Sequence, residues 1–336
     1  MFARILFPKD MNNYSPVVHP AFAYNHATFY FLCMKRLLLK LSFAVFFTAA
    51  CTTVYGQKAR HVIILGLDGL SVPGFKTAAH PHIDSLFANG VLSLTTRAVM
   101  PSVTLPNWTS HLTGSGPEEH GVTANSWLVN NHELEALAKD SAGYYPSIFS
   151  VLKEQVPKIK IGYYYNWKEL INPMNPSQMD ELSFEEKDEF SVNYHKAVNF
   201  VVQHKNEPTL VFLYSVHTDH AGHRYGWMSP QYIAAIERAD SAIGALVADL
   251  KAKQAFKDTY FLLITDHGGN PKTGHGGISM DEMQVPWAIT GPEIKKNGLT
   301  PIYNSNKNTA FVIAKIFGVT RLPAVWTGIL PGGVFK

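Results

Sequence analysis

Apolar residues gather in four short runs along the chain, at 60–67, 158–163, 210–216 and 260–265. Continuous runs of this kind, without polar alternation, are typical of strands that are buried on both faces. Between them lie helical patterns at 81–89, 106–112, 147–155, 184–204 and 230–253. Strands that alternate with helices predict an α/β fold, in which a mostly parallel central sheet carries helices on both faces.

Acidic residues and histidines follow three of the four predicted strands. Asp68 comes directly after the first run, His217 and Asp219 follow the third, and Asp266 with His267 follows the fourth. The carboxyl ends of parallel strands meet at one edge of a sheet, where the active sites of such folds lie. The sequence therefore predicts a functional site at this edge.

The stretch 163–183 is rich in Tyr, Asn and Pro and has little periodicity, so we expect it to form a loop over the same edge. No internal repeat, low-complexity tract or Ser/Gly-rich linker divides the chain after residue 56. We therefore interpret residues 57–336 as a single domain.

The charge of the chain is uneven. The formal net charge of +3 comes from residues 1–56, which hold five basic side chains and one acidic one; the rest has 24 basic and 25 acidic residues. Such a balance gives no sign of a nucleic-acid-binding surface. Of the 15 histidines, 13 lie after residue 56, which is a mild indication of metal chemistry.

The beginning of the chain has the pattern of a targeting signal. A charged stretch at 34–40 precedes a short apolar stretch at 41–50, and small residues follow up to Gly56. This predicts a signal peptide at 34–56 and a secreted or periplasmic protein. Residues 1–33 show no pattern and are interpreted as a non-native or unstructured extension. Two alternatives stay open: a retained anchor helix, and a lipid anchor at Cys51, which is the case in which we expect membrane attachment.

The two cysteines, Cys33 and Cys51, both precede the predicted cleavage point. The mature domain would then have no thiol, which excludes disulfides and thiolate metal ligands from it. Any metal ion would have to be held by His, Asp and Glu side chains.

Two groups of such residues are candidates. Asp68 and the Asp266-His267 pair are each followed by glycine, which lets the backbone come close to an ion. Asp219 and His223 are four residues apart, so one helical turn directs both at one point. A carboxylate at a strand end is also a common turn former or helix cap, and this alternative applies to each position taken alone.

Two further residues complete the candidate site. His275, in Gly-His-Gly-Gly, is the last histidine of the chain, so a further imidazole from the C-terminal part can only be this one. Thr104 stands just before the helix predicted to begin at Pro106, where free N–H groups and the helix dipole favour an anion. A plain capping hydroxyl is the alternative for Thr104.

Together these motifs resemble the nucleotide pyrophosphatase/phosphodiesterase family (type I phosphodiesterases) of the alkaline phosphatase superfamily. The resemblance covers most of 60–292 and rests on five motifs: Asp-Gly at 68–69, Thr-x-Pro-Asn at 104–107, Pro-Glu-x-His-Gly-x-x-x-Asn at 117–125, Asp-x-x-x-His at 219–223 and Asp-His-Gly at 266–268. It implies an alkaline-phosphatase-like fold and a phosphodiesterase-like catalytic domain at 57–336.

The resemblance also implies two zinc ions, with manganese as the alternative, and two sets of ligands: Asp68, Thr104, Asp266 and His267 for one ion, and Asp219, His223 and His275 for the other. The Thr104 hydroxyl, its pKa lowered by zinc, would attack a phosphate ester and form a phospho-threonine intermediate. Asn125 and the helix N–H groups would donate to the phosphoryl oxygens. The substrate would be a small phosphate ester, with a nucleotide as one candidate.

The chain departs from the larger members of that family in two places. Their last zinc-binding histidine lies well downstream of the Asp-His pair, whereas His275 follows Asp266 by nine residues. The family's aromatic residue after the nucleophile, which helps to sandwich a nucleobase, is Leu105 here.

Aromatic residues are abundant near the motifs, and we interpret five of them as the lining of a leaving-group pocket, with packing as the alternative: Trp108, Tyr163, Tyr164, Tyr165 and Trp167. Neither Arg97 nor Arg224 is placed by the sequence to bind a third phosphate oxygen, which favours diesters over monoesters. The main prediction is thus a secreted two-zinc hydrolase of phosphodiester or pyrophosphate bonds. A phosphomonoesterase or sulfatase-like hydrolase on the same scaffold, and a non-catalytic zinc-containing binding protein, are the alternatives.

Overall fold

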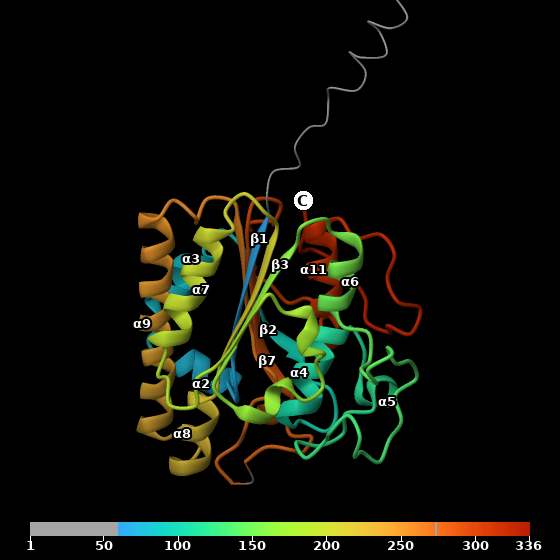
Figure 1. The fold of residues 1–336 in the computed structure, drawn as a ribbon. Coiled ribbons are helices and arrows are strands. Elements are labelled where there is room, and N and C mark those ends of the chain that lie inside the picture. Colours follow the sequence, from blue (N-terminus) through green and yellow to red (C-terminus); the bar gives the residue numbers. More distant parts are fainter. Residues whose placement is uncertain (1–59, 273) are drawn as a thin grey trace, which may run out of the picture. The chain divides into compact units, whose positions relative to one another are not determined.

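One mixed sheet organises the fold, which a computed structural model describes for residues 60–272 and 274–336. Its eight strands lie in the order β4-β3-β5-β1-β6-β7-β2-β8, and Figure 1 shows them between two groups of helices. The strands are β1 His61–Leu67, β2 Val91–Arg97, β3 Lys160–Tyr165, β4 Glu181–Phe184, β5 Thr209–Ser215, β6 Thr259–Ile264, β7 Gln284–Thr290 and β8 Gly298–Leu299. Only β7 runs antiparallel to its neighbours, β6 and β2. The predicted α/β fold with a mostly parallel sheet is confirmed.

The helices cover both faces of this sheet. They are α2 Val72–Thr77, α3 Pro81–Phe87, α4 Thr104–Thr113, α5 Pro117–His120, α6 Ile148–Gln155, α7 Val192–Gln203, α8 His217–Tyr225, α9 Pro230–Ala252, α10 Met280–Met283 and α11 Thr309–Phe317. Helices α2, α3, α7 and α8 pack on α9, and α4, α6 and α11 pack on one another. In Figure 1 the first group lies to the left of the sheet and the second to the right.

The central strand β1 explains why the predicted runs are uniformly apolar. Val62 and Ile64 belong to the core beneath α4, α6 and α11, whereas Ile63, Leu65 and Leu67 belong to the core beneath α7 and α9. Side chains of a strand alternate between the faces of a sheet, and here both faces are covered. The four predicted strands correspond to β1, β3, β5 and β6.

The helix predicted at 184–204 begins later than expected. Phe184 is the last residue of β4 and pairs with Tyr165 of β3. The carboxylate of Asp188 then accepts hydrogen bonds from the backbone N–H groups of Ser191, Val192 and Asn193. The first N–H groups of a helix have no partner within the helix, and here the Asp188 carboxylate accepts them. This explains why α7 starts at Val192.

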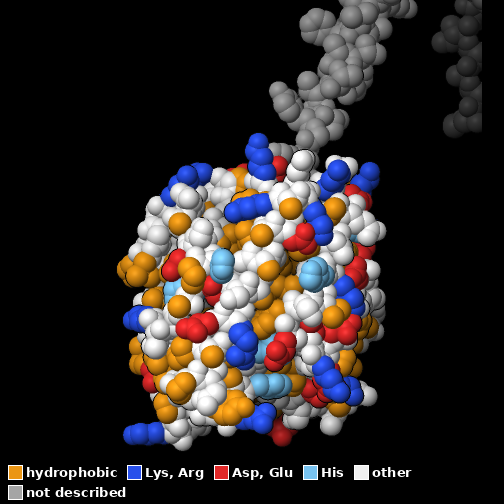
Figure 2. Space-filling model, turned by 90° about the vertical axis from the view of Figure 1, so that its left-hand side faces the viewer, with side chains coloured by type: hydrophobic (Ala, Val, Ile, Leu, Met, Phe, Trp, Pro, Cys, Tyr) orange, Lys and Arg blue, Asp and Glu red, His pale blue; other side chains and the backbone are white. Residues whose placement is uncertain are grey.

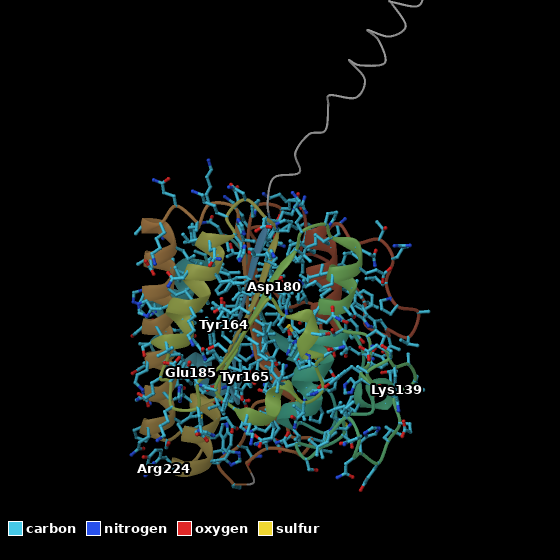
Figure 3. All side chains as sticks on the ribbon, in the orientation of Figure 1. Lys139, Tyr164, Tyr165, Asp180, Glu185 and Arg224 are labelled. Carbon is cyan, nitrogen blue, oxygen red and sulfur yellow. The ribbon has the colours of Figure 1, made fainter. Side chains whose placement is uncertain are left out.

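The stretch 163–183 was predicted to be a loop over the site, and this is wrong at both of its ends. Tyr163, Tyr164 and Tyr165 continue β3, and Glu181–Phe184 adds β4 to the sheet beside it. Two short 3-10 helices, Lys168–Ile171 and Pro176–Gln178, connect these strands. Figure 3 shows Tyr164 and Tyr165 on this part of the sheet.

Strand β7 was not predicted because Pro286 interrupts its sequence. A proline cannot donate to a neighbouring strand, and it is tolerated where the pairing is irregular. The register of β2 against β7 shifts between Ser93 and Thr96, opposite this proline. The irregular pairing therefore explains how a proline fits inside a sheet.

The predicted signal peptide at 34–56, with Cys51, and the extension at 1–33, with Cys33, lie outside the described residues. Within 60–272 and 274–336, no helix has the length and apolar character that crossing a membrane requires. On the face that α9 covers, basic and acidic side chains are interspersed (Figure 2).

Candidate metal centre and nucleophile

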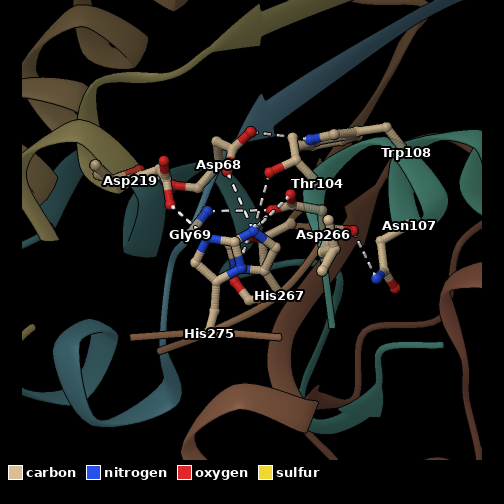
Figure 4. A network of polar contacts seen from close by, with 12 residues as sticks. Asp68, Gly69, Thr104, Asn107, Trp108, Asp219, Asp266, His267 and His275 are labelled. Carbon is tan, nitrogen blue, oxygen red and sulfur yellow. Dashed lines mark hydrogen bonds and ion pairs between the residues drawn. The ribbon is translucent and has the colours of Figure 1, made fainter. Parts of the chain in front are cut away.

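Asp68 follows β1 and is fully buried. One of its carboxylate oxygens, Oδ2, accepts hydrogen bonds from the Tyr214 hydroxyl on β5 and from Trp108 Nε1 on α4, the latter at 3.2 Å. The other oxygen, Oδ1, is buried without a hydrogen-bond partner. Two donors thus fix the carboxylate and leave one oxygen directed at the site (Figure 4).

Asp266 and His267 follow β6 and repeat this arrangement. Asp266 Oδ1 accepts the Gly69 N–H at 3.1 Å, whereas Oδ2 is buried without a partner. His267 Nδ1 lies 2.8 Å from the Gly268 carbonyl, so Nδ1 carries the proton and Nε2 presents a lone pair. Nε2 lies 3.6 Å from Asp68 Oδ1 and 3.2 Å from Asp266 Oδ2.

Asp219, His223 and His275 form the neighbouring group. Helix α8 brings the first two together, with His223 Nε2 3.5 Å from Asp219 Oδ1. His275 Nε2 lies 3.7 Å from the same oxygen and 3.0 Å from His223 Nε2. The ring of His275 stacks on that of His267 with their centroids 3.7 Å apart, so the two groups adjoin (Figure 4).

The donor atoms of these residues fit bound cations. Buried polar atoms are normally hydrogen-bonded, yet one oxygen each of Asp68, Asp219 and Asp266 has no partner. The ligand atoms of Asp68, Asp219 and His267 lie within 4.8 Å of one another, and so do those of Asp219, His223 and His275. The set consists of carboxylate oxygens and imidazole nitrogens, which suits zinc.

The pKa values show that burial opposes charge on the carboxylates of the site, a cost that a bound cation would offset. Burial raises the pKa of Asp219 and that of Asp266 to about 8. The neighbouring Asp68 adds to the rise in the pKa of Asp219. Burial also raises the pKa of Asp68, with Asp266 as the next cause. In contrast, burial lowers the pKa of His275 to about 3, which keeps its imidazole neutral and able to bind a metal ion.

Thr104 is the first residue of α4 and is buried beside this cluster. Its Oγ1 lies 3.2 Å from His267 Nε2 (Figure 4). The backbone N–H of Leu105 donates to Asn125 Oδ1 at 2.8 Å, so Asn125 lies against the start of this helix. Asn125 is half-buried and its Nδ2 carries two N–H groups, so this amide can donate to a ligand.

Some of the helix N–H groups that were expected to receive an anion are engaged within the protein. The N–H of Leu105 is taken by Asn125, Pro106 has no N–H, and the N–H of Asn107 donates to the Val103 carbonyl at 3.2 Å. A proline at the third helical position and a side chain that turns back onto the helix have removed these donors. The N–H groups of Leu105 and Asn107 are thus engaged within the protein in this structure.

Comparison with protein-family models identifies the family of this chain. Residues 62–303 match the model described as type I phosphodiesterase / nucleotide pyrophosphatase. The chain belongs to this family, an enzyme family of the alkaline phosphatase superfamily. The match contains all the residues discussed above, from Asp68 to His275.

Several relatives and solved structures agree. The chain is 26% identical over 221 residues to ectonucleotide pyrophosphatase/phosphodiesterase family member 3 of Mus musculus, covering 62% of this chain and 24% of that protein. It is 23% identical over 297 residues to the bis(5'-adenosyl)-triphosphatase of Homo sapiens, covering 81% of this chain and 63% of that protein. An inactive variant of murine ectonucleotide pyrophosphatase/phosphodiesterase 5 in complex with AMP has the same fold, with a TM-score of 0.66 at 16% identity over 79% of this chain and 96% of that one. The chain thus spans about a quarter to two thirds of the curated relatives' length.

The predicted aromatic pocket of this phosphodiesterase-family chain is largely wrong. Tyr163, Tyr164 and Tyr165 are buried in the cores on either side of β3, and Trp108 is buried against Asp68. The unbroken run of β-forming residues extends the strand, which turns these rings into packing residues. Trp167 is the exception, since it is half-buried and packs near Leu105.

The structure also holds supporting residues that the sequence analysis missed. Asn306 Nδ2 donates to the Asp266 carbonyl at 2.7 Å and to Asn107 Oδ1 at 3.0 Å, which joins the loop that carries Asp266 to α4. Asn304, Asn306 and Asn308 are all buried, and this alternation of asparagines is the one signal that could have found them. Nothing in the sequence placed Tyr214 beside Asp68, because that contact depends on the order of the strands.

Proposed function

We propose that this chain is a two-zinc hydrolase of phosphodiester or pyrophosphate bonds, with Thr104 as its nucleophile. The observation that carries the proposal is the position of Thr104 Oγ1, 3.2 Å from His267 Nε2 and beside carboxylates whose inner oxygens have no partner. A hydroxyl that serves as a helix cap stands at the N-cap position, which in α4 is occupied by Val103, whereas Thr104 is the first helical residue and its hydroxyl contacts His267 Nε2.

The ligands divide into two sets. Asp68, Thr104, Asp266 and His267 would hold one zinc, because His267 Nε2 lies within 3.6 Å of an oxygen of each of the other three. Asp219, His223 and His275 would hold the other, with Asp219 also close to the first set, and manganese is the alternative metal. When bound, the ions supply positive charge that lowers the pKa of the Thr104 hydroxyl and offsets the negative charge of the leaving oxygen.

The reaction would proceed in two displacements. The deprotonated oxygen of Thr104 attacks phosphorus, the bond between phosphorus and the leaving oxygen breaks, and phospho-threonine forms. Water then attacks the same phosphorus and releases Thr104 with a phosphate group on the product. Asn125 Nδ2 donates to a non-bridging oxygen of the substrate, because its Oδ1 is already engaged by the Leu105 N–H.

Diesters or pyrophosphates are the favoured substrate class for an electrostatic reason. A monoester carries an additional charge that a third cationic anchor would have to offset. Arg97 is exposed and its guanidinium contacts Met280 Sδ at 3.0 Å, and Arg224 is exposed with its guanidinium over the Tyr225 ring. Figure 3 shows Arg224 at the outer end of α8. Neither observation supports a role in binding phosphate.

A nucleotide is a candidate substrate because one relative is a bis(5'-adenosyl)-triphosphatase and one structural neighbour binds AMP. Leu105 cannot stack on a base, because it is buried with Val122 and Trp127. Any aromatic contact to a nucleobase on this side would come from the half-buried Trp167.

We further propose that residues 57–336 act as one catalytic domain and that the protein is secreted or periplasmic. The support is the signal pattern at 34–56 and the ectoenzyme names of relatives. Determination of the N-terminus of the protein recovered outside the cytoplasm tests this, with Gln57 as the expected first residue.

The decisive experiment compares wild type with Thr104→Ala and Thr104→Ser on a bis-aryl phosphate, an aryl phosphate and an aryl sulfate, with zinc content measured for each protein. Wild type should prefer the bis-aryl phosphate, and Thr104→Ala should lose a factor on the order of 10³ or more in kcat. Full activity of Thr104→Ala would refute the assignment of Thr104 as the nucleophile. A preference for the monoester or the sulfate would favour the related hydrolase, and zinc without turnover of any ester would favour a binding protein.

A further inference from the structure

The loop that carries His275 is unusual in composition. Between Gly268 and Ser279, five of twelve residues are glycine. Gly276 has a φ of +106°, which other residues rarely adopt. Glycine loses more conformational freedom on ordering than any other residue, so contacts from outside the loop have to hold His275 in place.

The first such contact is Ser102, a fully buried residue two positions before Thr104. Its hydroxyl donates to the Gly277 carbonyl at 2.7 Å and accepts the Gly276 N–H at 3.0 Å. Its carbonyl oxygen lies 3.0 Å from His275 Nδ1. Ser102 therefore fixes both the turn after His275 and the tautomer whose Nε2 lone pair faces His223 and Asp219.

The second contact is Glu282 on α10, which is also buried. Its Oε1 accepts the Gly277 N–H at 2.8 Å, and its Oε2 accepts the Ser279 N–H at 3.0 Å. The Ser279 hydroxyl donates to Oε2 as well. Although burial opposes ionisation, the bonds from Ser279 and Gly277 lower the pKa of Glu282, so a charged acceptor holds this end of the loop.

We propose that Ser102 and Glu282 are positioning residues for the second metal ion, and that they act by holding His275. The inference rests on the proposed function, since it takes Asp219, His223 and His275 as the ligands of that ion. It explains how a histidine only nine residues after Asp266 reaches the site: the glycine-rich loop folds back onto the turn that carries the nucleophile. Ser102 thereby links the loop that carries His275 to the turn that carries Thr104.

The test is a zinc titration of the full chain against a competing chelator, which resolves a first and a second binding step. Ser102→Ala removes the two bonds of the hydroxyl to the turn and keeps the carbonyl that contacts His275 Nδ1, so the second step should weaken by roughly 10-fold while the first changes by less than about threefold. Glu282→Gln keeps one acceptor and should weaken the second step by a smaller factor. Ser147→Ala removes the N-cap of α6, away from the metal-binding residues, and should leave both steps unchanged while lowering the melting temperature.

A double-mutant cycle shows whether Ser102 acts through His275. In a His275→Ala background, Ser102→Ala should cause no further loss in the second step. Equal loss in both backgrounds, or weakening of the two steps by the same factor, would overturn the inference in favour of a general structural role. A Ser102→Ala protein that binds two zinc ions like wild type would also overturn it and leave the proposed function intact. Failure of wild type to bind a second zinc ion would instead remove the proposed function itself.

Discussion

Substitution of Tyr214 by phenylalanine tests the geometry of the metal centre without touching a ligand. The change removes one oxygen from a fully buried side chain and keeps the ring that packs against Trp108. In wild type the Tyr214 hydroxyl and Trp108 Nε1 both donate to Asp68 Oδ2, so Oδ1 faces the cluster. In Tyr214→Phe only the indole donor, at 3.2 Å, remains.

The size of the effect follows from the charge and burial of the acceptor. A hydrogen bond to a charged group contributes about 1.5–3 kcal/mol, and the buried Asp68 oxygen has no water to replace it. If this energy is lost only in the metal-bound form, where Asp68 is ionised, zinc binding at the first site weakens by roughly 10- to 150-fold. Outer partners of metal ligands have effects of about this size.

The assay is a competition titration with a zinc chelator, read alongside thermal unfolding of the metal-free protein. Tyr163→Phe is the matched control, because Tyr163 is equally buried, lies on the neighbouring strand β3 and donates to the Leu170 carbonyl at 3.2 Å, away from the ligands. It should lower stability without changing zinc affinity. Equal zinc affinity of Tyr214→Phe and Tyr163→Phe would refute the view that Tyr214 orients Asp68.

Three more outcomes are expected. Removal of zinc by a chelator should abolish turnover and lower the melting temperature, both recovering on addition of zinc; at 1,000 times its Kd, a bound ion contributes about 4 kcal/mol to folding. Asn306→Ala should cost about 2–4 kcal/mol in denaturant unfolding, because it breaks the bonds to Asp266 and Asn107, and it should lower activity more than Asn308→Ala does. Burial lowers the pKa of His120 to about 3, and the unfolded state, with a pKa near 6.5, therefore binds the proton first as pH falls. Between pH 6.5 and about 3, stability should thus drop by about 1.4 kcal/mol per pH unit from this residue. A plot of unfolding free energy against pH for His120→Asn that is as steep as that of wild type would contradict this assignment.

The sequence correctly predicted the strands and spacings that depend on neighbouring residues in the chain. Apolar runs found β1, β3, β5 and β6, and the polar residues that follow β1, β5 and β6 became the candidate ligands. The spacing of Asp219 and His223 was read correctly as one helical turn, because it depends only on helix geometry.

The sequence did not predict features that depend on contacts with distant parts of the chain or on the pairing of strands. The start of α7 depends on the carboxylate of Asp188, and β7 depends on an irregular register opposite Pro286. The tyrosines of β3 were interpreted as a pocket because the strand was ended at Tyr163, two residues early. Contacts such as Tyr214 with Asp68 require the order of strands, which no local pattern specifies.

The compactness of the candidate site has a physical explanation in the sheet order. Strands β5, β1 and β6 are adjacent and parallel, so Asp219, Asp68 and Asp266 leave the sheet at neighbouring positions of one edge. Thr104 begins α4, and His275 comes from a loop that is held by Ser102 and Glu282. All candidate ligands therefore lie between residues 68 and 275, inside the matched family region 62–303.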